Sequence, residues 1–201
     1  MQRSFLVFGI AFIALMAGAL FYAARIPVQI PVPEPVAEPV AAGAFAPFYP
    51  SFKLTDMDGV ERDFSVWQGK HRLLNFWATW CAPCRREIPL LKAFQDEHGE
   101  TFQIIGIAVD FPEQVTAYAE TAEFNYPILV GQDDAMAVAE TSGVDFIGMP
   151  FTMIVAADGE LINTHVGEIM DTHLEHIAKV LTMLDNGEID KESAREALNF
   201  L

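Results

Sequence analysis

The stretch FWATWCAPCRREIP, residues 76–89, decides the expected fold, because it carries a short apolar run through two cysteines into a helix. The run that ends at Trp77 predicts a buried strand, and the helix is expected to begin around Pro83. Cys81 and Cys84, the only two cysteines of the 201-residue chain, are therefore expected at a helix N-terminus. Backbone N–H groups and the positive end of the helix dipole stabilise a thiolate there.

This placement predicts redox chemistry for the cysteine pair. A thiolate at Cys81, further favoured by Arg85 and Arg86 in the first helical turn, attacks a disulfide sulfur and forms a mixed disulfide. Cys84 lies one turn later and can release the bound molecule by attacking Cys81. A structural zinc site would need four ligands, typically with a second cysteine pair. Half of a metal site and a static disulfide stay open as alternatives.

Outward from this segment, strand and helix patterns alternate, which predicts an α/β fold with a mixed, mostly parallel central sheet flanked by helices. Asp58-Gly59 predicts a hairpin before the sheet, and Asp158-Gly159 predicts an antiparallel edge. The expected strands span 72–77, 102–109, 126–130, 151–156 and 161–166, and the expected helices 83–98, 113–123, 133–141, 172–184 and 190–200.

The N-terminal region predicts a membrane anchor and a spacer. Residues 4–24 carry no charge and are almost all apolar, long enough for a helix across a bilayer. We expect residues 1–25 to form a single-pass anchor, with a cleaved signal peptide as the alternative; either would export the domain. Proline recurs throughout residues 26–49, which predicts an extended linker. A single α/β domain is expected over 50–184 and a helical extension over 185–201.

The net charge of −16 argues against nucleic-acid binding, which needs clustered Lys and Arg. The acids concentrate after residue 95, whereas the region around the cysteines is slightly cationic. An acidic surface also keeps a protein soluble, so the charge alone assigns no partner. No cofactor and no metal ligand is predicted.

The motif WCAPC, with Pro89 five residues after the second cysteine, resembles the active site of the thioredoxin fold. Asn75 in LLNFWATWC and Glu87 in CRREIP are more specifically similar to the TlpA/ResA group of membrane-anchored thioredoxins. The resemblance covers about residues 50–182. It implies a thioredoxin-like fold and a thiol–disulfide oxidoreductase.

The resemblance also implies a binding site for protein substrates. In GMPFT, residues 148–152, it implies a cis bond between Met149 and Pro150 and a proline close to both sulfurs; an ordinary turn proline is the alternative. The backbone of Met149 would pair with a bound peptide as an added strand. The candidate substrate-contacting residues are Trp80, Ala82, Pro83 and Met149.

Glu87 is the candidate acid–base group. It lies three residues after Cys84, on about the same helical face, where partial burial would raise the pKa of its carboxyl. It could then take the proton from Cys84. Asn75 occupies the position of the buried acid of minimal thioredoxins and cannot itself move protons. The alternative is that Glu87 is a surface acid paired with Arg85 or Arg86.

CAPC has no histidine between its cysteines, which predicts a reducing couple and hence a reductase of disulfides in exported proteins, such as cytochrome c or copper-centre assembly clients. The resemblance implies a transmembrane thiol electron donor as a partner. The expected location is the inner membrane, with the domain in the periplasm. The alternatives are a thiol peroxidase of the peroxiredoxin type and a non-enzymatic copper chaperone. Peroxiredoxins carry a PxxxTxxC pattern, whose proline this chain lacks, and the exported copper chaperones have CxxxC spacing, whereas this chain has CxxC.

Overall fold

The computed structural model describes residues 48–143 and 148–199. The predicted anchor, residues 1–25, lies outside the described residues, as does almost all of the predicted linker. None of the helices within the described ranges is long and apolar enough to cross a membrane.

A seven-stranded mixed sheet forms the centre of the described domain, in the order β2-β1-β5-β4-β3-β6-β7. Strand β3, beside the central strand β4, is buried at all seven positions, although His71, Arg72 and Asn75 are polar. A buried polar side chain needs a hydrogen-bond partner, so these residues demand specific contacts. The strands are β1 (Lys53–Asp56), β2 (Glu61–Asp63), β3 (His71–Trp77), β4 (Phe102–Val109), β5 (Ile128–Gly131), β6 (Phe151–Val155) and β7 (Leu161–Val166).

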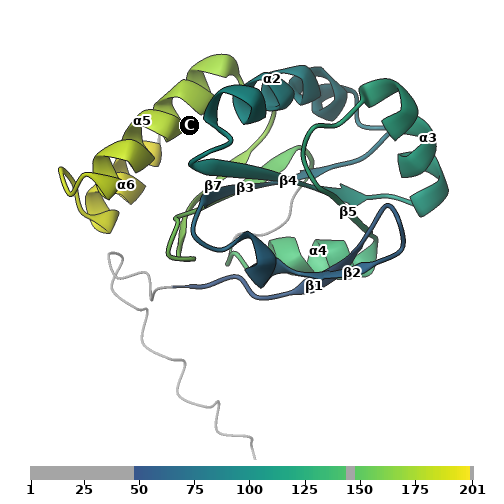
Figure 1. Cartoon of the computed structure of the whole chain (residues 1–201), viewed down its shortest axis with the longest axis horizontal. Coiled ribbons are helices and arrows are strands. Elements are labelled where there is room, and N and C mark those ends of the chain that lie inside the picture. Colours follow the sequence, from purple (N-terminus) through teal and green to yellow (C-terminus); the bar gives the residue numbers. More distant parts are fainter. Residues whose placement is uncertain (1–47, 144–147, 200–201) are drawn as a thin grey trace, which may run out of the picture. The chain divides into compact units, whose positions relative to one another are not determined.

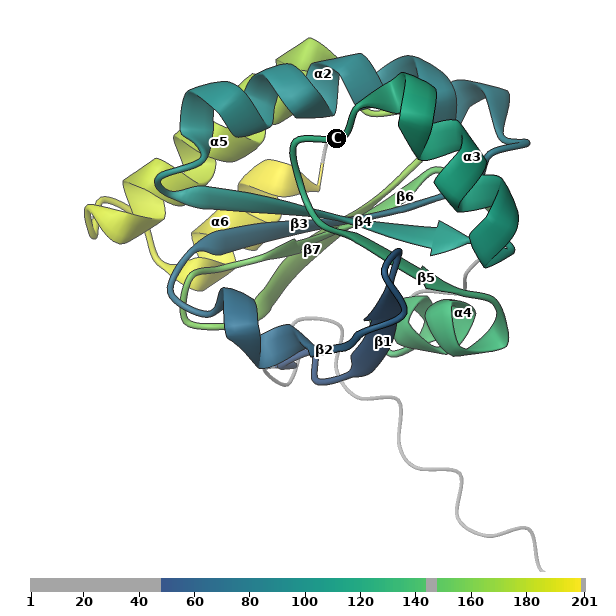
Figure 2. The same cartoon turned by 45° about the vertical axis from the view of Figure 1, so that its right-hand side comes forward.

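Helices cover both faces of this sheet (Figures 1 and 2). In both views α2, α3 and α5 lie on one face, whereas α4 and the 3-10 helix η1 lie on the other. Two hydrophobic clusters correspond to the two faces, and the one under α2 contains both cysteines. The bounds are η1 (Phe64–Trp67), α2 (Ala82–His98), α3 (Pro112–Ala122), α4 (Asp133–Glu140), α5 (Asp171–Asp185) and α6 (Lys191–Leu198).

The prediction of a mixed sheet is confirmed, but that of a mostly parallel sheet is wrong. Only the pairs β3–β4 and β4–β5 are parallel among the described strands, since α2 and α3 return the chain between them. Every other neighbouring pair in the described sheet is antiparallel. Tight turns join β1 to β2 and β6 to β7, and a tight turn can only reverse the strand direction.

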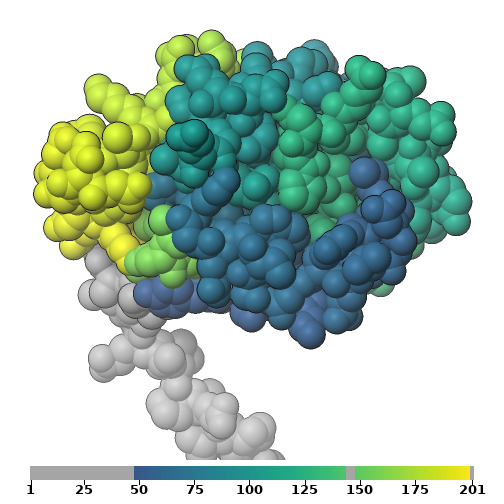
Figure 3. All heavy atoms as spheres, in the orientation of Figure 1, coloured from purple at the N-terminus to yellow at the C-terminus, as the bar shows by residue number. Residues whose placement is uncertain are grey.

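The C-terminal helix α6 packs on the domain. Ala194 and Leu198 are fully buried in the cluster that also contains the cysteines. His176 of α5 lies 2.9 Å from the carbonyl oxygen of Ala197, which adds a polar contact between the two helices. In Figure 3 the C-terminal residues, drawn in yellow, lie against the rest of the domain at the left.

Candidate active site

Cys81 and Cys84 form a disulfide at the start of α2, with an S–S distance of 2.00 Å. Cys81 is the N-cap residue, and its Sγ accepts a hydrogen bond from the backbone N–H of Cys84 at 3.3 Å. This donor, together with the helix N-terminus, favours negative charge on the sulfur of Cys81. Cys81 is 5% exposed and Cys84 is 0% exposed. Cys81 is therefore the sulfur that an incoming disulfide can reach.

A buried carboxylate, which the sequence analysis missed, holds the loop that leads into Cys81. Asp110 directly follows β4, and its Oδ2 accepts hydrogen bonds from the backbone N–H of Thr79 at 2.9 Å and from the Thr79 hydroxyl at 2.7 Å. The parallel strands β3 and β4 end at the same edge of the sheet, which brings the two segments together. The Asp110 side chain thus fixes the backbone two residues before the reactive sulfur.

The Met149–Pro150 bond is cis, as the resemblance implied. Phe151 of β6 pairs with Phe76 of β3, so Pro150 lies at the end of β3 that leads toward Cys81. Its carbonyl oxygen accepts a hydrogen bond from the backbone N–H of Gly167 at 2.9 Å. Met149 is half-buried and packs against the cluster that includes both cysteines.

Glu87 is fully buried within α2, which is more burial than the sequence analysis expected. Its Oε1 accepts a hydrogen bond from Nδ2 of Asn75 at 2.7 Å, and its Oε2 accepts one from the backbone N–H of Ile169 at 2.7 Å. Burial raises the pKa of the Glu87 carboxyl to about 7, against the lowering effect of these two donors. The charge of Glu168 raises the pKa further. A group that titrates near neutrality is suited to exchange protons with a thiol.

The alternative that Glu87 is a surface acid paired with a neighbouring arginine is wrong. The guanidinium of Arg86 instead binds the carboxylate of Glu168, with Nε 3.0 Å from Oε1. This contact connects the first turns of α2 to the loop between β7 and α5. The same loop supplies the Ile169 N–H to Glu87, so two contacts fasten it to the cysteine-bearing helix.

The surface around the cysteines is rich in exposed apolar side chains. Trp80, next to Cys81, is 69% exposed, and Phe111, next to Asp110, is 52% exposed. Of the other candidate contact residues, Ala82 is exposed and Pro83 is half-buried in the first turn of α2. The exposure of Phe111 could not be predicted, because nothing in the sequence distinguishes it from a core aromatic residue.

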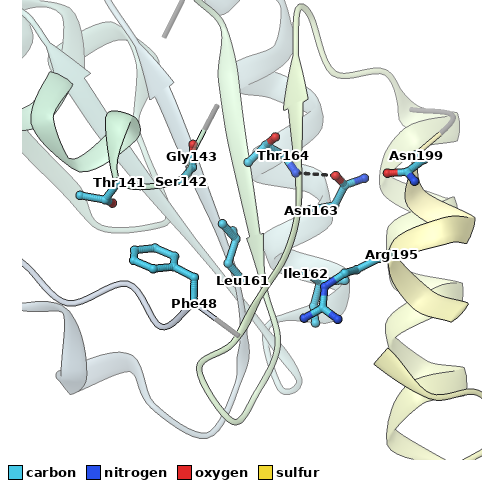
Figure 4. Close-up of a pocket in the computed structure, with 10 residues that line it drawn as sticks. All are labelled: Phe48, Thr141, Ser142, Gly143, Leu161, Ile162, Asn163, Thr164, Arg195 and Asn199. Carbon is cyan, nitrogen blue, oxygen red and sulfur yellow. Dashed lines mark hydrogen bonds between the residues drawn. The ribbon is translucent and has the colours of Figure 1, made fainter. Parts of the chain in front are cut away.

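A separate cavity of about 330 Å³ lies between β7 and α6 (Figure 4). Figure 4 shows Arg195 of α6 and Asn199, the residue that follows α6, on one side of it and Phe48 on the other. None of the predicted site residues lines this cavity. The lining residues are Phe48, Thr141, Ser142, Gly143, Leu161, Ile162, Asn163, Thr164, Arg195 and Asn199.

An accessible sulfur that attacks, joined to a buried sulfur that resolves, is the chemistry of thiol–disulfide oxidoreductases with the thioredoxin fold, and the protein is an enzyme of this class. The chain belongs to the AhpC/TSA family, whose model matches residues 47–164. It is 33% identical over 134 residues to the thiol-disulfide oxidoreductase ResA of Geobacillus kaustophilus, covering 64% of this chain and 75% of the relative. It is 31% identical over 130 residues to the thioredoxin-like protein YneN of Bacillus subtilis, covering 63% and 74%.

Solved structures agree with this assignment. A thiol:disulfide interchange protein of the thioredoxin family from Chlorobium tepidum has a TM-score of 0.62 and 28% sequence identity, covering 69% of this chain and 98% of that one. DsbF of Mycobacterium tuberculosis has a TM-score of 0.57 at 22% identity, covering 65% and 94%, and shows the same fold. The predicted thioredoxin-like fold and the resemblance to the TlpA/ResA group are confirmed.

Proposed function

We propose that this oxidoreductase is an exported reductase of protein disulfides. The structural observation that supports a dithiol–disulfide cycle is the buried carboxyl of Glu87, three residues after Cys84, with its pKa raised to about 7 by burial. Residues three apart on a helix are neighbours. A base is therefore available beside the second thiol, and that thiol must lose its proton before it can release a bound client.

The reaction begins with the reduced enzyme. The Cys81 thiolate attacks one sulfur of a client disulfide, and the other client sulfur leaves as a thiolate. Glu87 then takes the proton from the Cys84 thiol, and the Cys84 thiolate attacks Sγ of Cys81. The Cys81–Cys84 disulfide forms, the second client sulfur leaves, and two electrons have passed to the client. The two client thiolates are protonated, and Glu87 returns its proton.

The surface around the site supports a protein as the client. The exposed Trp80 adjoins Cys81, and the exposed Phe111 adjoins Asp110, which holds the backbone of Thr79. The exposed Val166 and Met170 flank the loop that contacts Pro150 and Glu87. These four exposed apolar side chains could bury their surface against an extended client polypeptide. In this proposal Met149, beside the cis-proline, pairs its backbone with the client chain as an added strand.

The proposed direction of electron transfer, from the enzyme to its client, and the proposed location outside the cytoplasm rest on the sequence. CAPC has no histidine between its cysteines to stabilise the thiolate strongly, which favours a reducing couple. The apolar residues 4–24 and the proline-rich residues 26–49 support a membrane tether with the domain outside the cytoplasm. An exported reductase needs electrons from within the cell, so we propose a transmembrane dithiol protein as its donor. In cells expressing the full chain and treated with a membrane-impermeant reductant, a membrane-impermeant maleimide should label Cys81; labelling only after lysis would contradict export.

Reduction of insulin tests the proposed activity. With dithiothreitol as the electron source, the protein should accelerate insulin reduction well above the uncatalysed rate, measured as turbidity from the released B chain. A Cys81→Ser variant should give only the uncatalysed rate. Slow insulin reduction combined with rapid consumption of hydrogen peroxide would contradict the proposal and would favour a thiol peroxidase.

A further inference from the structure

The carboxyl group of Glu87 is held by two donors from different parts of the fold. Asn75, at the middle of β3, donates to Oε1, and the backbone N–H of Ile169 donates to Oε2, both at 2.7 Å. All of these groups are buried. An ionised carboxylate satisfies both donors, whereas a protonated carboxyl has an O–H that requires an acceptor.

The two partners differ in what they can do when Glu87 is protonated. A backbone N–H can only donate, so a proton on Oε2 would face the N–H of Ile169. The side-chain amide of Asn75 has a donor end and an acceptor end. Its Oδ1 is buried and has no hydrogen-bond partner. A half turn about the last side-chain bond exchanges Nδ2 and Oδ1, and the oxygen then faces Oε1.

The neighbour of Asn75 allows the same half turn. Nδ2 of Asn75 also donates to the hydroxyl oxygen of Thr152 in β6, at 3.1 Å. A hydroxyl can accept a hydrogen bond or donate one. After the half turn, Thr152 and protonated Oε1 would both donate to Oδ1 of Asn75. The amide thus offers a donor to the Glu87 carboxylate and an acceptor to the protonated carboxyl without any movement of the backbone.

We propose that Asn75 is a positioning residue of the resolving step, whose amide donates to the Glu87 carboxylate, turns over when Glu87 is protonated, and directs the proton to Oε1. This inference rests on the acid–base role proposed for Glu87. It gives a function to the residue at which the chain departs from the buried acid of minimal thioredoxins. An aspartate at that position could not donate to a carboxylate when ionised.

In addition to Asn75, titratable groups near Glu87 interact with its charge. Glu168 raises the pKa of Glu87 through its charge, and it is itself bound to Arg86. Burial raises the pKa of Tyr126, with the charge of Glu87 as a second cause. Within the described domain, the titratable groups that interact with Glu87 are Glu168 from the β7–α5 loop and Tyr126 before β5, and Cys84 lies one turn earlier on α2.

Titration of Glu87 itself tests the proposal without any client. In the oxidised full-length protein with carboxyl-labelled glutamate, NMR should give a Glu87 midpoint near 7. In Asn75→Leu the midpoint should rise by about one pH unit or more, because a donor to the ionised form is lost. Asn75→Asp keeps the volume of the side chain and should also raise it, in case the leucine variant fails to fold. A midpoint unchanged in a folded variant would overturn the proposal.

A double-mutant comparison separates positioning from a merely structural role. The rate of the resolving step is measured against pH for the wild type and Glu87→Gln, each with and without Asn75→Leu. We expect Asn75→Leu to move the wild-type profile to higher pH and to have no further effect beside Glu87→Gln. Equal slowing in both backgrounds would overturn the role of Asn75. A pH profile that Glu87→Gln leaves unchanged would instead overturn the proposed acid–base function of Glu87.

Discussion

Cys84→Ser is expected to abolish multiple turnover and to leave Cys81 covalently joined to its client. Sγ of Cys81 is the more accessible sulfur and accepts a hydrogen bond from the backbone N–H of Cys84, whereas the Cys84 side chain is fully buried. The first attack therefore needs only Cys81, and the release needs Cys84. The adduct should be visible on a non-reducing gel, should disappear with dithiothreitol, and should give the mass of a one-to-one mixed disulfide.

The matched control is Cys81→Ser. It leaves a buried thiol at Cys84, which we expect to form no adduct with the same client under the same conditions. Both variants should keep the fold, because serine is close to cysteine in volume and the disulfide closes a ring of only four residues. Adducts formed by Cys81→Ser but not by Cys84→Ser would reverse the assigned roles of the two sulfurs.

Glu87→Gln is expected to slow the resolving step by about 10²-fold or more, the usual contribution of a positioned acid–base group. The amide has the shape of the carboxyl but cannot take a proton. Since the pKa of Glu87 is about 7, the wild-type rate should rise as the pH passes through 7 and more carboxylate is present. Rapid mixing of the reduced enzyme with a fluorescent disulfide client measures this. Glutamine should remove that rise, and a rise retained in Glu87→Gln would rule out the assigned base.

The same variant should change how stability depends on pH. The pKa of Glu87 is about 7 in the folded protein and 4.5 in a solvated reference, so the folded state keeps a proton that the unfolded chain loses. Protonation of Glu87 therefore contributes to the free energy of unfolding in full below pH 4.5. This contribution decreases as the pH rises toward 7, by about 3 kcal/mol. Urea unfolding at several pH values should show this decrease in the wild type and not in Glu87→Gln. Glu97→Gln, an exposed site on the same helix, should behave as the wild type.

The elements of the fold could be predicted largely from local patterns. The strands at 102–109 and 161–166 have the predicted bounds, because apolar or alternating runs there are bordered by clear turns. The direction of strand pairing could not be predicted in the same way. β1 pairs with β5 and β6 pairs with β3 across long stretches of sequence, and local patterns carry no information about those partners.

The candidate site was partly predictable for similar reasons. The two cysteines and Pro150 lie in recognisable motifs, whereas the donor from Ile169 is a backbone N–H and has no signature in the sequence. Asp110 had a usable signal, since it is an acid that directly follows a buried strand parallel to β3. The complete burial of Glu87 was not evident, because the loop between β7 and α5 that covers it is distant in the sequence.

The reduction potential of the Cys81–Cys84 pair tests the central claim most directly. The protein is equilibrated with mixtures of reduced and oxidised dithiothreitol or glutathione, the thiols are trapped, and the reduced fraction is measured. We predict a value near that of thioredoxin, about −270 mV, as expected of a reductase that receives electrons from a membrane donor. A value near about −120 mV would contradict the account and would identify a donor of disulfides.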